Sequence, residues 1–176
     1  MDMLPKTTPR TGDVFEIYCG STPESGMTAV SDSMFKRNYR PFNMNVDELR
    51  TDKGRALALS TALALREGGL FLACPSHKTM LKPTRKSFGR ASMSPTGSQA
   101  VTEVREDNLI SSFITMVVAL LHIRSVQWAV YQPPSSFFWE QPGWEDISKV
   151  HKAPHFMIYV GSEHLRTPHG LVAKSS

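Results

Sequence analysis

The 176-residue sequence contains few of the features that usually reveal a function. Its two cysteines, Cys19 and Cys74, are too few for a disulfide framework, which favours a reducing compartment. No stretch reaches the roughly 20 apolar residues that span a bilayer. Residues 1–10 carry prolines and charges where a secretory signal needs an apolar run. We therefore expect a cytoplasmic protein with no membrane partner.

Motifs for phosphate and metal binding are also missing. Neither G-x-x-x-x-G-K nor G-x-G-x-x-G occurs in the sequence. His151 and His155 are four residues apart, but Pro154 prevents the helix that would point both side chains at one metal. We expect no cofactor and no metal site.

Runs of residues with a single sign of charge are rare in this sequence, and one segment is the exception. The 20 Lys and Arg residues exceed the 16 Asp and Glu residues by four, and basic and acidic residues are mostly interspersed. Residues 76–102, called here the basic loop, contain no acidic residue. A loop of this length within one domain is usually functional or disordered. Its cations are Lys78, Lys82, Arg85, Lys86 and Arg90.

Apolar periodicity predicts alternating strands and helices. Strands are expected at 13–19, 70–74, 126–131 and 156–160, with an edge strand at 171–172. Asn45 followed by Glu48 is a capping-box pattern that predicts the start of a helix. Gly54 is expected to split or bend this helix, and Gly68-Gly69 to end it. Two further helices are predicted at 103–123 and 144–151.

The predicted helix at 103–123 has the clearest amphipathic pattern. Its apolar residues recur at intervals of three and four, so we expect them to pack against a sheet. They are Ile110, Phe113, Ile114, Val117, Val118 and Leu121. The alternation predicts an α+β or α/β fold, with a mixed sheet of four to six strands flanked by two main helices. Residues 1–12 are expected to be a flexible lead-in to a single domain at 13–176.

The C-terminal part carries a pattern of short motifs. A long amphipathic helix leads to Ala129-Val130-Tyr131 with Pro133, then Phe137-Phe138, a strand at 154–160, and finally residues 167–171 (TPHGL). Gln132 stands where the pattern has an aromatic residue. In these features the last seventy or so residues resemble a bacterial domain family of unknown function. The resemblance implies a cytoplasmic α/β fold and no catalytic residues.

A Cys/His site is one candidate for chemistry. Ligands of open α/β sheets bind beyond the carboxyl ends of the strands, where Cys19, Cys74 and His77 are expected. A thiol beside an imidazole is the minimum for nucleophilic catalysis. The alternative is that both cysteines are small buried hydrophobic residues.

Two surface features remain as candidates for binding. Phe137, Phe138, Trp139 and Trp144 are either the centre of a protein interface or part of the core. The basic loop either holds phosphates or is a solvated surface. Because the catalytic pattern is weak, the favoured hypothesis is a non-enzymatic protein that binds a protein partner, similar to an immunity or inhibitor protein from bacteria or phage. The alternatives are a small Cys/His enzyme and a nucleic-acid-binding accessory protein. The oligomeric state stays open.

Overall fold

The computed structural model describes residues 12–18, 41–75, 78–151, 163–167 and 170–174. The chain forms an α/β fold around one sheet of four parallel strands in the order β2-β1-β3-β4. The predicted fold class is confirmed, although this sheet is parallel and not mixed. The flexible lead-in was expected at residues 1–12, of which 1–11 lie outside the described residues. The strand predicted at 156–160 lies wholly outside them.

The strands are β1 (Gly12–Tyr18), β2 (Pro41–Asn45), β3 (Leu65–Ala73) and β4 (Gln127–Val130). Strand β2 was not predicted, because it is short and begins with proline. Proline is tolerated there because β2 is an edge strand and Pro41 is its first residue. A separate antiparallel hairpin joins β5 (Glu163–Thr167) to β6 (Gly170–Lys174), the latter at the predicted edge strand.

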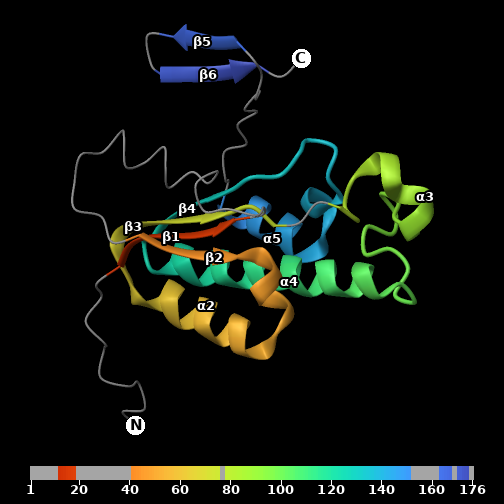
Figure 1. The fold of residues 1–176 in the computed structure, drawn as a ribbon, viewed down its shortest axis with the longest axis horizontal. Coiled ribbons are helices and arrows are strands. Elements are labelled where there is room, and N and C mark those ends of the chain that lie inside the picture. Colours follow the sequence, from red (N-terminus) through yellow and green to blue (C-terminus); the bar gives the residue numbers. More distant parts are fainter. Residues whose placement is uncertain (1–11, 19–40, 76–77, 152–162, 168–169, 175–176) are drawn as a thin grey trace.

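Helices α2 (Asp52–Ala64) and α4 (Thr102–Ile123) both cover one face of the sheet (Figure 1). Helix α2 leads from β2 to β3, and α4 leads from β3 to β4, so both connections move in the same direction across the sheet. Right-handed crossovers that move in one direction place their helices on the same face. A further helix, α5 (Pro142–His151), packs against α4.

The predicted end of α2 is wrong by three residues. The helix stops at Ala64, and residues 65–69 belong to β3. Gly68, expected to stop the helix, lies within the strand with a φ of 73°. Arg124 donates hydrogen bonds to the carbonyl oxygens of Ala62 and Leu65, and Leu65 is buried in the core. Tertiary contacts at the helix end therefore override the local helix propensity of residues 65–67.

The capping-box prediction is confirmed, but it begins a 3₁₀ helix, η2 (Val46–Arg50). The Asn45 side chain accepts a hydrogen bond from the backbone of Asp47, and Glu48 accepts one from the backbone of Asn45. Thr51 then caps α2 by accepting a hydrogen bond from the backbone of Gly54. The chain thus makes two consecutive helix starts where the sequence predicts one bent helix.

The core lies between the sheet and its helices. All six predicted apolar positions of α4 are buried there. The length and composition of α4 also fit a membrane span, with a mean hydropathy of 1.3 over its most apolar window, of which 44% is buried. Core helices meet the same criterion, and the buried face of α4 accounts for much of this apolar character.

Candidate anion-binding pocket

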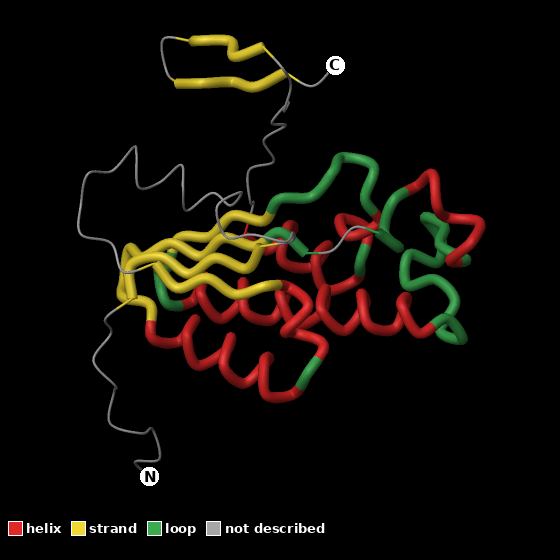
Figure 2. The backbone as a smooth tube through the Cα atoms, viewed as in Figure 1, coloured by secondary structure: helices red, strands yellow, loops and turns green. Residues whose placement is uncertain are grey.

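The described part of the basic loop is folded, not extended (Figure 2). It contains a 3₁₀ turn, η3 (Lys82–Thr84), and a single helical turn, α3 (Arg85–Phe88). The backbone of Ser98 donates a hydrogen bond to the carbonyl of Phe88, which closes the following turn. Gly97 is required in this turn. Its φ is 64°, and a Cβ there would lie 2.7 Å from the carbonyl oxygen of Phe88.

Backbone pairing joins the basic loop to the chain that follows β4. Phe137 donates its backbone N–H to Met80, and Lys82 donates to Ser135. The Gln132 side chain, itself buried, donates to the carbonyl of Pro75 and accepts from Ser136. These two segments follow the carboxyl ends of neighbouring parallel strands, where open α/β sheets bind their ligands.

A buried polar chain holds the loop on α4. Arg90 donates hydrogen bonds to Thr79 and Asn108, and Thr79 donates to the Asp107 carboxylate at 2.6 Å. Burial lowers the pKa of Arg90 from its ordinary value, and the negative charge of Asp107 partly opposes this shift. Gln141 adds a hydrogen bond to the carbonyl of Pro95. The loop is therefore anchored by hydrogen bonds to both terminal nitrogens of the buried Arg90 guanidinium and by Gln141.

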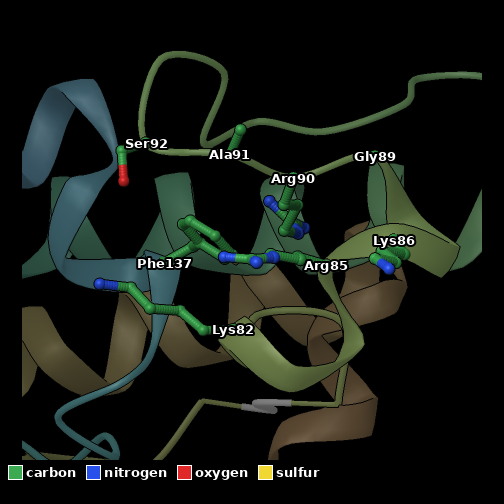
Figure 3. Close-up of a pocket in the computed structure, with 8 residues that line it drawn as sticks. All are labelled: Lys82, Arg85, Lys86, Gly89, Arg90, Ala91, Ser92 and Phe137. Atoms are coloured by element: carbon green, nitrogen blue, oxygen red, sulfur yellow. The ribbon is translucent and has the colours of Figure 1, made fainter.

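These elements surround a pocket of about 500 Å³ (Figure 3). No acidic side chain is among the described residues that line it, which are Lys82, Arg85, Lys86, Gly89, Arg90, Ala91, Ser92 and Phe137.

The pocket has a buried floor and an exposed rim. Arg90 and Phe137 are each 2% exposed, whereas Lys82, Arg85 and Lys86 are exposed. In the close-up, the side chain of Arg85 extends toward Phe137, and Lys86 lies on the opposite side of the pocket (Figure 3). The Lys82 ammonium lies 5.9 Å from the centre of the Phe137 ring.

The cations differ in how far their charge is already compensated. Lys82 forms a 3.1 Å ion pair with Glu140, and Arg90 interacts with Asp107 through Thr79. Within the described parts of the chain, the side chains of Arg85 and Lys86 form no hydrogen bond or ion pair. The pocket therefore presents two uncompensated positive charges to an anion.

The structure distinguishes among the five predicted cations. Lys82, Arg85 and Lys86 all line the rim of the same pocket. Lys78 is exposed but does not line the pocket. Arg90 was expected to contact phosphate with the others. Its buried guanidinium is instead engaged with Thr79 and Asn108 and anchors the loop.

The predicted aromatic interface is not exposed. Phe137, Phe138 and Trp144 are buried, and Trp139 is half-buried with its indole N–H donating to the carbonyl of Pro133. Rings of Phe138, Trp139 and Trp144 pack with centroid separations of 5.1–5.3 Å. Of the two alternatives for these side chains, the structure shows packing in the core, where burial of large apolar rings is favourable.

The predicted Cys/His site is only partly described. Cys74 directly follows β3, is partly buried, and donates its backbone N–H to Ile17. Cys19 and His77 lie outside the described residues, so their predicted proximity to Cys74 stays a prediction. Among the residues that are described, no group of three His, Cys, Asp or Glu side chains is placed to hold a metal ion.

Comparisons with protein-family models, curated proteins and solved structures found no match to this chain.

Proposed function

We propose that this protein binds nucleic acid by holding phosphate groups on its basic loop. The observation that carries the proposal is the pocket rim, where Arg85 and Lys86 have no charge partner among the described residues and Lys82 lies close by. Guanidinium and ammonium groups are the usual protein partners of phosphate. The net charge of +4 also favours an anionic ligand over a neutral one.

The alternative of a protein partner has weaker support. It depended on four aromatic side chains, three of which are buried. The basic loop keeps four of its five cationic side chains exposed on a folded scaffold, which lowers the entropy lost when a ligand binds. Because the proposed contacts are made to phosphates, which are the same for every base, we expect binding with little dependence on base sequence.

The test is a titration of labelled single-stranded and double-stranded oligonucleotides, followed by fluorescence anisotropy at several salt concentrations. Binding should weaken steeply with salt, and Arg85→Gln or Lys86→Gln should each flatten the log–log slope by about 1. Lys53→Gln is the matched control, because Lys53 is an exposed cation on α2 outside the pocket. Lack of binding to both probes at low salt would exclude the proposed function.

A further inference from the structure

The pocket has a buried floor and a charged rim. Arg90 and Phe137 form that floor, and the three exposed cations stand above it. An internal phosphate of a strand carries a sugar on each side, so two sugars must be accommodated around the pocket. A phosphate at the end of a strand has one free side and can enter the pocket.

The charge of the pocket also favours a phosphate at the end of a strand. Four cations line it, while Glu140 and Asp107 each compensate one of them, so two positive charges remain at Arg85 and Lys86. A phosphate monoester carries about −1.5 to −2 at neutral pH, whereas each phosphate within a strand carries one negative charge. A monoester therefore matches the uncompensated charge more closely than a diester.

The side chains supply suitable donors. The planar guanidinium of Arg85 can donate two parallel hydrogen bonds to one phosphate, and the Lys86 ammonium on the opposite side adds a compact charge (Figure 3). The fixed loop limits rearrangement, since Arg90 and Gln141 tie it to α4 and to the start of α5.

We propose that the pocket receives the terminal phosphate monoester of a nucleic-acid strand. This inference rests on the proposed function and deepens it, because it separates recognition of a strand end from general attraction to the phosphate backbone. The chemistry recognised is a phosphate monoester, whose source is either a strand end or a free mononucleotide. The strand end is favoured because it adds backbone phosphates, and Lys78 of the same loop is an exposed cation that does not line the pocket.

The experiment compares three single-stranded oligonucleotides of one sequence, bearing a 5′-phosphate, a 3′-phosphate or hydroxyls at both ends. At least one phosphorylated strand should bind about tenfold more tightly than the unphosphorylated strand, as expected for added charge-assisted hydrogen bonds. Arg85→Gln and Lys86→Gln should remove this preference. Lys78→Gln should keep it, because Lys78 belongs to the same loop but does not line the pocket.

Each other outcome overturns a specific claim. Equal, salt-dependent affinity for the three strands would overturn strand-end recognition and leave the proposed function standing. Failure of every strand to bind would remove both. A competition with a nucleoside monophosphate and with inorganic phosphate distinguishes the sources. If either bound as tightly as the phosphorylated strand, the ligand would be a small phosphate and the assignment to a strand end would be wrong.

Discussion

At the scale of single residues, the arginine that the sequence suggests as a ligand contact is a structural residue. Arg90 is 2% exposed and Asp107 is 4% exposed, and Thr79 connects them by accepting from the first and donating to the second. Arg90 and Asp107 are linked through this hydroxyl and not by a direct ion pair. Removing one of two buried opposite charges still leaves the other uncompensated, which costs more than removing an exposed charge.

We therefore predict that Asp107→Ala lowers the free energy of unfolding by about 3–5 kcal/mol, because Arg90 would remain buried without its counter-charge. Asp107→Asn should cost less, since an amide oxygen can still accept from Thr79. Glu103→Gln, an exposed substitution on the same helix, is the control and should change stability by less than about 1 kcal/mol. Urea denaturation measures all three. A small loss for Asp107→Ala would mean that Arg90 is solvated.

At the scale of elements, α4 carries both the core and the support of the pocket. Its inward face contains the predicted apolar positions, and Asp107 and Asn108 near its start hold the basic loop. Its outward face includes Met116, which is 43% exposed. The two faces thus differ in burial within a single helix, which allows a matched comparison.

Phe113→Ala should destabilise the protein by about 3–5 kcal/mol, because it removes a buried ring and leaves a cavity. Met116→Ala should cost less than about 1 kcal/mol, since its side chain is partly solvated and alanine favours the helix. Thermal and chemical unfolding of the two variants would show the difference. Similar losses at both positions would contradict the orientation of α4 against the sheet.

At the scale of the whole molecule, the order of strands decides which segments are most stable. Strands β1 and β3 each have a hydrogen-bonded neighbour on both sides, whereas β2 and β4 lie at the edges. Phe15, Ile17 and Phe71 in the central strands are fully buried. The pocket, by contrast, is built from loops beyond the carboxyl ends of β3 and β4.

Hydrogen exchange should follow this arrangement. Backbone amides of β1 and β3 are expected to exchange only through global unfolding, whereas those of β2 and β4 exchange through local opening at lower free energy. Exchange measured by mass spectrometry on peptides from each strand tests this order. The stabilising effect of a bound oligonucleotide should appear in residues 78–98 of the basic loop. Uniform exchange across the four strands would contradict the central position of β1 and β3.

The sequence by itself determined the fold class, the inward face of α4 and the clustering of basic residues in one loop. These properties depend on local periodicity and composition, which short-range geometry translates directly into structure. It did not determine β2, because an edge strand needs little apolar character, nor the end of α2, where Arg124 and the burial of Leu65 override propensity.

Only the tertiary structure decided which members of the basic loop line the pocket. Lys82 and Phe137 are 55 residues apart, and they meet because backbone pairing joins the loops that follow β3 and β4. The same packing buries Arg90 against Asp107 and leaves Arg85 and Lys86 on the rim. Charge is a property of the residue type, but the availability of that charge depends on long-range contacts, because burial and counter-charges come from segments distant in the sequence.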